Sequence, residues 1–450
     1  MKWSRNPNTA SFIYLDPMNL YRVVLLVISS CTLVPGLQAQ SKTDSLLYGI
    51  LTSSSSPVVK QVLSNPDSFR CQVIYTRIDR DKMGVPSFKN FYYHVNRDQY
   101  FNPASMVKLP LAALSLEKLQ TLKQEGIDRE TIVYFDSSYP KQVPLNRDST
   151  SENGLPSIAQ FIRKAFLISD NDAYNRMYQF VSQRTINRRL REMGYRNTRI
   201  TRQFMGFDDA GNRHTNPIRF LAPDGMLLSI QPPAYNTDSF RFPKPVLIGN
   251  GYMNANDQLV KEPFNFTRHN SIPLEDLQSM MKSIIFPASM KKKSRFKIDT
   301  DDRLFMLKYL SQYPSETSYP KYDDSVFYDS YVKFFFRDST HKMPAGVRVF
   351  NKVGWAYGFL TDVSYVLDTI HNVEYMLAAT IYVNADGILN DDRYEYDSIG
   401  YPFLKSIGNA VYEYELKRVR KSSYTLPGFG ISYDRRNPED DRPAIRIADN

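Results

Sequence analysis

The stretch LISDNDAYN, residues 167–175, joins two helical patterns and places three polar residues at their junction. The spacing of apolar residues predicts one helix ending near Ile168 and another over residues 172–181. Aspartate or asparagine at such a junction commonly caps the following helix by accepting a hydrogen bond from its first turn. The motif Ser169-Asp170-Asn171 therefore has a structural interpretation, a helix break, beside a functional one.

A second motif, Ser105-Met106-Val107-Lys108, lies upstream at the start of a helical pattern. Residues three apart on a helix share one face. Serine is a weak nucleophile unless a base lies within hydrogen-bond reach, and a lysine at this spacing meets that need. The motif is weak evidence alone, because Ser115/Lys118 and Ser289/Lys292 repeat its spacing.

A third motif, Lys352-Val353-Gly354, lies on a predicted strand that follows the apolar run 346–350. A glycine in a strand allows another chain segment or a ligand to approach closely. The residue after the motif is Trp355.

The three motifs, in this order, resemble the active-site set of the penicillin-recognising serine hydrolases, the family of class A β-lactamases and penicillin-binding proteins. The resemblance implies that Ser105 is the acylated nucleophile and Lys108 its base. It implies that Ser169 relays a proton to the leaving nitrogen. Asn171 would orient Lys108 and bind the substrate amide.

The same resemblance assigns three residues of the third motif to substrate binding. Lys352 would attract the substrate carboxylate or relay a proton, and Gly354 would admit the substrate. The backbone amides of Trp355 and Ser105 would form the oxyanion hole.

Two positions depart from the family pattern. Val353 replaces a serine or threonine, which removes a hydroxyl that would help to hold the carboxylate of a β-lactam. Phe204 falls where class A enzymes carry the glutamate that activates the deacylating water. Glu262 is predicted to be the substitute catalytic residue. The alternative interpretation of Glu262 is a solvated loop acid. Asp208 and Asp209 are lesser candidates.

The order of predicted elements indicates an α+β fold. Strand patterns near residues 71–79 and 91–95 open the domain, and helical patterns fill its middle. Three strand-like runs and a final helical pattern close it, at 346–353, 360–367, 375–383 and 401–414. We expect an antiparallel sheet built from both chain ends with flanking helices, plus an inserted all-helical subdomain, which is also what the resemblance implies.

Composition along the chain predicts five segments. They are a signal peptide at 1–39, a linker-like N-terminal arm at 40–69, a β-lactamase-like serine hydrolase domain at 70–415 with an irregular insertion at 201–271, and a loosely attached charged tail at 416–450.

The amino terminus indicates export. Arg22 precedes the apolar run 23–28, and Ala39 offers a cleavage site. A rival interpretation is a lipobox at 28–31, which would leave Cys31 lipidated and the protein anchored in a membrane. We therefore expect a periplasmic or secreted protein, or a membrane-anchored lipoprotein. Removal of the signal leaves Cys71 as a single thiol, so no internal disulfide is expected.

Composition excludes several other classes. The 450-residue chain carries a formal charge of +10, but its acids are interspersed and no nucleic-acid-binding motif occurs. Five scattered histidines form no zinc-protease pattern, and there is no phosphate loop or dinucleotide-binding glycine run. We expect no metal, cofactor or nucleic acid.

The sequence thus predicts an exported serine hydrolase of the class A β-lactamase type, of the kind linked to β-lactam resistance and catabolism. It would form an acyl-enzyme on Ser105 and hydrolyse a β-lactam or a related amide. One alternative is a penicillin-binding or D,D-peptidase-like enzyme acting on peptidoglycan peptides. Another is a catalytically silent homologue that binds cell wall or a protein.

Overall fold

A five-stranded antiparallel sheet is the centre of the computed structural model, which describes residues 41–420, 424–426 and 428–447. The strand order is β10-β11-β12-β1-β2. The strands span Gln72–Arg80 (β1), Pro86–Tyr93 (β2), Val347–Ala356 (β10), Phe359–Asp368 (β11) and Val373–Tyr382 (β12). Because β1 pairs with β12, the two ends of the chain share one sheet. The predicted α+β class and the sheet assembled from both chain ends are confirmed.

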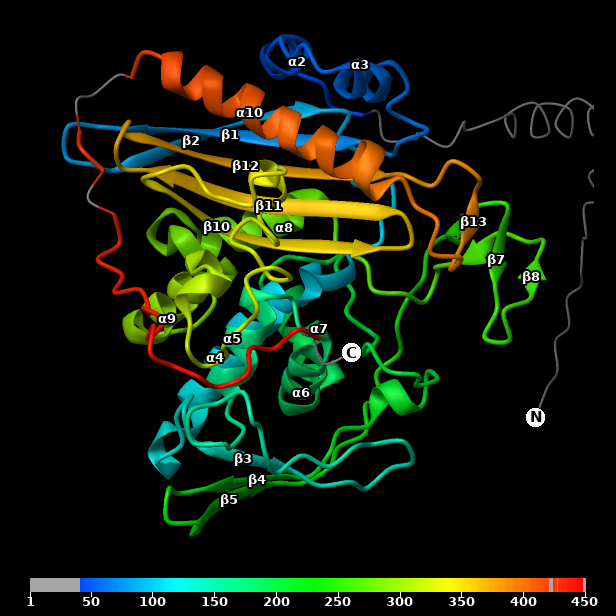
Figure 1. The fold of residues 1–450 in the computed structure, drawn as a ribbon. Helices are drawn as coiled ribbons and strands as arrows, with labels where there is room; N and C mark the ends of the chain where they lie inside the picture. Colours follow the sequence, from blue (N-terminus) through cyan, green and yellow to red (C-terminus); the bar gives the residue numbers. More distant parts are fainter. Residues whose placement is uncertain (1–40, 421–423, 427, 448–450) are drawn as a thin grey trace, which may run out of the picture. The chain divides into compact units, whose positions relative to one another are not determined.

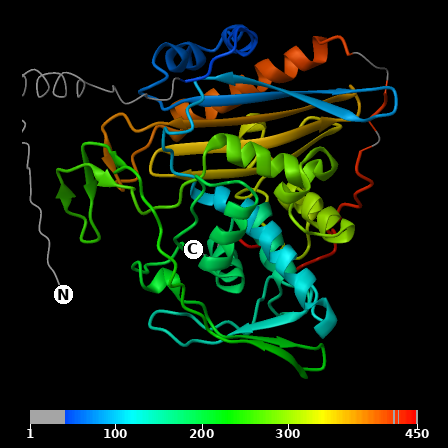
Figure 2. The same cartoon turned by 180° about the vertical axis from the view of Figure 1, so that it is seen from behind.

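Helices cover both faces of the sheet (Figure 1). Helix α10, Tyr401–Lys417, lies on one face together with α2, Ser45–Thr52, and α3, Pro57–Ser64. The remaining α-helices of the described residues lie on the side of the other face. They are α4 (Lys108–Leu122), α5 (Ile158–Leu167), α6 (Asn171–Val181), α7 (Gln183–Glu192), α8 (Leu274–Ile285) and α9 (Thr300–Ser311). Seen from behind, α4 and α8 lie beneath the sheet (Figure 2). Successive side chains of a strand point to opposite faces of the sheet, and they contribute to two separate apolar cores, one on each face.

The inserted part is not all-helical as expected. Strands β3 (Ile132–Phe135), β4 (Ile218–Leu221) and β5 (Leu227–Gln231) form a small antiparallel sheet at its far end. Ile218 and Phe220 point into the core while their neighbour Arg219 is partly exposed, which is the alternation of a strand.

The segment 201–271 is irregular but also contains short strands. They are β6 (Leu247–Ile248), β7 (Gly251–Met253), β8 (Leu259–Val260) and β9 (Phe264–Asn265), and β13 (Ile388–Leu389) pairs with β7.

The arm predicted to be linker-like and the tail expected to be loosely attached are both packed. In the predicted arm, the side chains of Leu47, Leu51, Val59 and Val62 are fully buried, because α2 and α3 cover the edge of the sheet beside α10. In the predicted tail, Leu426 is buried and Phe429, Ile431 and Ile445 pack against the main core. Sparse apolar residues thus anchor a segment whose overall composition is charged. The domain boundaries themselves stay predictions.

The predicted signal peptide and Cys31 lie outside the described residues. Within the described ranges, no helix has both the length and the apolar character needed to cross a bilayer.

Candidate active site

Ser105 and Lys108 meet at the start of α4. Ser105 lies in a 3₁₀ turn, Ala104–Val107, and the α-helix begins only at Lys108, whereas the sequence predicted a helix from Ser105. In a 3₁₀ turn the side chains of residues i and i+3 are eclipsed. The Nζ atom of Lys108 accordingly lies 2.7 Å from the Oγ atom of Ser105.

The turn that presents Ser105 is held in a strained conformation. Ala104 has a φ of 43°, in the left-handed region that an alanine rarely adopts. Its N–H donates to Oδ1 of Asn102 at 2.8 Å, and Met106 N–H donates to the carbonyl of Pro103 at 2.8 Å. These bonds fix Ser105 in place, and strain of this kind is typical of functional sites.

Lys108 is fully buried and connects the first motif to the second. Its ammonium donates to Oδ1 of Asn171 at 2.8 Å, to Oγ of Ser169 at 3.3 Å and to the carbonyl of Ser169. Burial lowers the pKa of Lys108 to about 7, although the nearby Asp170 acts in the opposite direction. Near neutral pH a large fraction of this amine is therefore unprotonated and able to accept a proton.

The second motif forms a loop between α5 and α6. Ser169 has a φ of 69°, and Asp170 caps α6 by accepting the Ala173 N–H at 2.7 Å. The capping role expected for an acidic residue here is observed. Ser169 and Asn171 nevertheless point to Lys108, so the segment breaks the helix and also contributes to the site.

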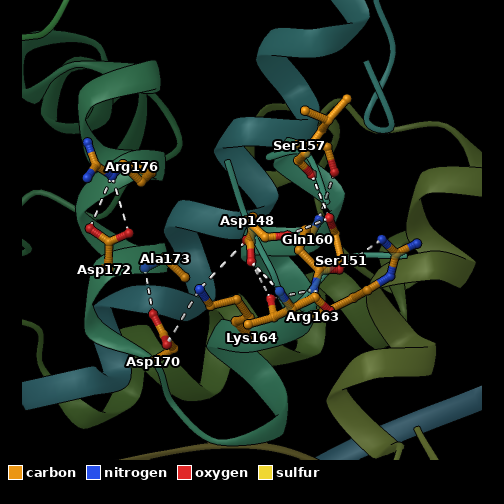
Figure 3. A network of polar contacts seen from close by, with 12 residues as sticks. Asp148, Ser151, Ser157, Gln160, Arg163, Lys164, Asp170, Asp172, Ala173 and Arg176 are labelled. Atoms are coloured by element: carbon orange, nitrogen blue, oxygen red, sulfur yellow. Dashed lines mark hydrogen bonds and ion pairs between the residues drawn. The ribbon is translucent and has the colours of Figure 1, made fainter. Parts of the chain in front are cut away.

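A buried ionic network, which the three motifs did not predict, lies behind this loop. The ammonium of Lys164, on α5, lies 3.9 Å from Oδ2 of Asp170 and 3.7 Å from Oδ2 of Asp148 (Figure 3). The side chain of Lys164 is 5% exposed, so solvent and salt screen these charges only weakly. The network braces the loop. The signal for it was a lysine on the apolar face of a predicted helix.

Lys352 reaches the same point from the sheet. Its Nζ atom donates to Oγ of Ser169 at 2.8 Å and to the carbonyl of Val353 at 2.8 Å. Burial and the neighbouring Lys108 both lower the pKa of Lys352 well below its usual value. The Ser169 hydroxyl thus lies between two lysines and can exchange a proton with either of them.

Val353 points away from these groups. Its side chain is fully buried in the apolar core that includes Phe403 and Ile407 of α10, while Lys352 occupies the opposite face of the strand. A valine is therefore well suited to the environment at this position. The ring of Trp355 also turns to the α10 side, where it contacts Phe334 with ring centroids 5.8 Å apart.

Gly354 allows β10 to pack directly against the nucleophile turn. A Cβ atom at this position would lie 2.5 Å from the carbonyl oxygen of Pro103 and 3.1 Å from the nitrogen of Met106. The close approach that glycine permits is therefore made to the Ser105 turn.

We expect Gly354→Ala to separate β10 from this turn, to destabilise the fold by about 1–3 kcal/mol and to slow reactions at Ser105. Thermal unfolding and acylation rates check this result. Gly49→Ala is the matched control, since no atom lies within 4 Å of its added methyl group. Equal effects of the two substitutions would contradict the argument.

Phe204 lies beside Lys108. Its ring centroid is 5.3 Å from the Lys108 Nζ atom and 4.4 Å from the ring of Tyr174. Asn175 fixes its backbone by accepting the Phe204 N–H at 2.8 Å. An aromatic ring thus occupies the position where the resemblance implies a carboxylate.

The structure does not bring the substitute acids to Ser105. Glu262 is exposed between β8 and β9, and β8, which pairs with β7, lies away from α4 in both views (Figures 1 and 2). Asp208 accepts the Gly211 N–H at 2.7 Å, and Asp209 pairs with Arg268. Within the described part of the chain, no hydrogen bond or ion pair joins any of the three to Ser105 or Lys108. The insertion that carries Glu262 pairs with β13 instead, and this explains its distance from the site.

Residues 76–228 match the family model described as the beta-lactamase enzyme family. The predicted resemblance to this family is confirmed. The match contains the first two motifs, and the third motif lies beyond it.

Solved β-lactamases from three bacteria are also similar to the chain. The enzyme from Xanthomonas campestris pv. campestris is 11% identical, with 82% of this chain and 99% of the other covered, at a TM-score of 0.42. That from Francisella tularensis is 14% identical, with 78% and 97% covered, at 0.44. That from Burkholderia ambifaria is 11% identical, with 82% and 99% covered, at 0.43. No curated protein matches the chain significantly.

Within the described residues, no group of three or more histidine, cysteine, aspartate or glutamate side chains is arranged to hold a metal. The polar groups around Ser105 are instead two lysines, a second serine and an asparagine.

Proposed function

We propose that this protein is a serine hydrolase of the class A β-lactamase type that forms an acyl-enzyme on Ser105 with a β-lactam or a related amide. The observation that carries the proposal is the pair formed by Ser105 Oγ and Lys108 Nζ, 2.7 Å apart, with the lysine pKa lowered to about 7. A nucleophile within reach of a neutral amine is ready for acyl transfer.

In the proposed acylation, Oγ of Ser105 attacks the amide carbonyl and its proton passes to the neutral amine of Lys108. The backbone amides of Ser105 and Trp355 would stabilise the negative charge that develops on the carbonyl oxygen. Collapse of the tetrahedral intermediate breaks the carbon–nitrogen bond and leaves an ester on Ser105.

The leaving nitrogen needs a proton, and Ser169 is the proposed donor. Its hydroxyl is 2.8 Å from Nζ of Lys352 and 3.3 Å from Nζ of Lys108. A proton taken up by Lys108 therefore has a short path to the leaving group through Ser169. Asn171, bound to Lys108, would also hold the substrate amide.

The groups available for deacylation favour a second candidate, a penicillin-binding or D,D-peptidase-like enzyme acting on peptidoglycan peptides. The Phe204 ring beside Lys108 cannot activate water, and Glu262 is remote and exposed. With no carboxylate joined to Ser105 or Lys108 in the described ranges, this second candidate predicts a long-lived acyl-enzyme.

Incubation of the purified protein with benzylpenicillin, followed by intact mass over time, tests the proposal. Ser105→Ala is expected to abolish the adduct. Ser115→Ala is the matched control, because Ser115 belongs to a second Ser-x-x-Lys pair on α4 and donates only to the Leu111 carbonyl. A transient adduct supports a β-lactamase, and a stable adduct supports the penicillin-binding candidate. A folded protein that forms no adduct favours the catalytically silent alternative.

The pH dependence of acylation follows from the lowered pKa of Lys108. Only its neutral form accepts the serine proton, so the rate constant rises as pH increases through about 7. We expect an increase of about tenfold between pH 6 and pH 8 and a plateau above it. Stopped-flow measurement with a chromogenic cephalosporin checks this profile, and a rate that falls over the same range would refute Lys108 as the base.

We also propose that the protein is exported, on the basis of its amino-terminal sequence. Mass analysis of the mature protein from cell fractions distinguishes cleavage after Ala39 from a lipidated Cys31. An intact amino terminus in the cytoplasm would refute export.

A further inference from the structure

A cavity of about 230 Å³ lies apart from the predicted active site, and none of the predicted site residues line it. Its walls come from four segments that are distant in the sequence, at residues 97–101, 197–199, 243–246 and 271–273. Three cationic side chains line it, whereas Asp98 is its one acidic lining residue within the described chain.

Two of the three cations are already accounted for. Arg97 pairs with Glu275 and Asp276 of α8. Lys244 is exposed to solvent. Arg199 is therefore the cation whose environment needs an explanation.

Arg199 is a half-buried guanidinium group with no carboxylate partner in the described ranges. Its Nε atom is buried and makes no hydrogen bond there. The guanidinium carbon lies 5.7 Å from the centre of the Phe242 ring, and burial lowers the pKa of the group. A buried donor without an acceptor is costly, and it binds a charged acceptor strongly when one is supplied.

The backbone of Arg199 is fixed, so its side chain starts from a defined position. Arg199 and Ser271 exchange two backbone hydrogen bonds, each of 2.8 Å. The rest of the lining is mixed: Tyr100 and Val246 are among its apolar residues, and Asp98, Gln99 and Asn197 are among its polar ones. A cavity that combines apolar walls with a half-buried cation lacking a carboxylate partner in the described ranges suits a ligand that carries both an oxyanion and an apolar group.

We propose that this cavity binds a small carboxylate- or phosphate-bearing ligand, with the oxyanion on Arg199 and the apolar part against the partly exposed Tyr100 and Val246. The site is distinct from the acyl-transfer groups, since neither Ser105 nor Lys352 lines it.

Isothermal titration of the full chain with benzoate, phenyl phosphate and the neutral benzamide tests the proposal. At least one anion is expected to bind tenfold or more tightly than benzamide, and the preferred anion identifies the chemistry. Arg199→Gln is expected to weaken that binding at least tenfold, and Arg199→Lys to weaken it less. Arg196→Gln is the matched control, because Arg196 is exposed and lies outside the cavity.

Lys352→Met separates this site from the predicted active site. Anion binding that survives Lys352→Met and is lost in Arg199→Gln supports the proposal, provided that thermal unfolding shows both variants to be folded. Binding lost in Lys352→Met and retained in Arg199→Gln would overturn it. Equal affinity for benzoate, phenyl phosphate and benzamide, or no saturable binding of either anion, would overturn it as well.

Discussion

Replacing Lys108 with methionine is expected to slow acylation of Ser105 by benzylpenicillin by about 10²–10⁴-fold, the usual contribution of a general base. Methionine nearly matches the length of lysine and suits a fully buried position. It cannot accept the serine proton, and it leaves the Asn171 oxygen without its donor. Time-resolved intact mass gives the acylation rate constant directly.

The matched control is Lys118→Met on the same helix. Lys118 is also a largely buried lysine with a pKa lowered by burial, to about 8, but it bonds to the Phe180 carbonyl and to Gln231, away from Ser105. We expect Ser105 of the Lys118→Met variant to be acylated at the rate of the unmodified protein. If Lys108→Met acylates as fast as Lys118→Met, Lys108 is not the base.

Replacing Phe204 with glutamate is expected to accelerate release of the acyl group by about 100-fold, the lower range for a positioned general base. The Phe204 ring lies 5.3 Å from the Lys108 ammonium, so a carboxylate here would be close to the ester on Ser105. Asn175 already fixes the backbone at this position. Release is measured as the loss of the mass adduct after free penicillin is removed.

Phe204→Gln controls for side-chain size and polarity without supplying a base. It is expected to leave the acyl-enzyme as long-lived as before. The new carboxylate also favours the protonated form of Lys108, so the acylation profile of Phe204→Glu is expected to move to higher pH. Equal release rates for the glutamate and glutamine variants would contradict the role assigned to this position.

Local sequence determined the chemistry offered by each motif. The i, i+3 spacing of Ser105 and Lys108 made their contact predictable, although the turn is 3₁₀ where an α-helix was expected. Asp170 was predictable as a cap because capping involves only the next three residues. The strand-like runs at 346–353 and 360–367 predicted β10 and β11, and the ends of the chain were expected to share a sheet.

Tertiary structure alone decided which of these groups act together. Lys352 and Ser169 are 183 residues apart, and only the tertiary placement of β10 beside the loop between α5 and α6 brings their side chains within 2.8 Å. The same packing turns Val353 into the α10 core and leaves Glu262 exposed in the bend between β8 and β9. The sequence by itself determined residue types, spacings and local caps, because these depend on near neighbours. The partners of Ser169, the burial that lowers the pKa of Lys108, and the anchoring of the arm and tail were decided by contacts between distant segments, which local patterns do not encode.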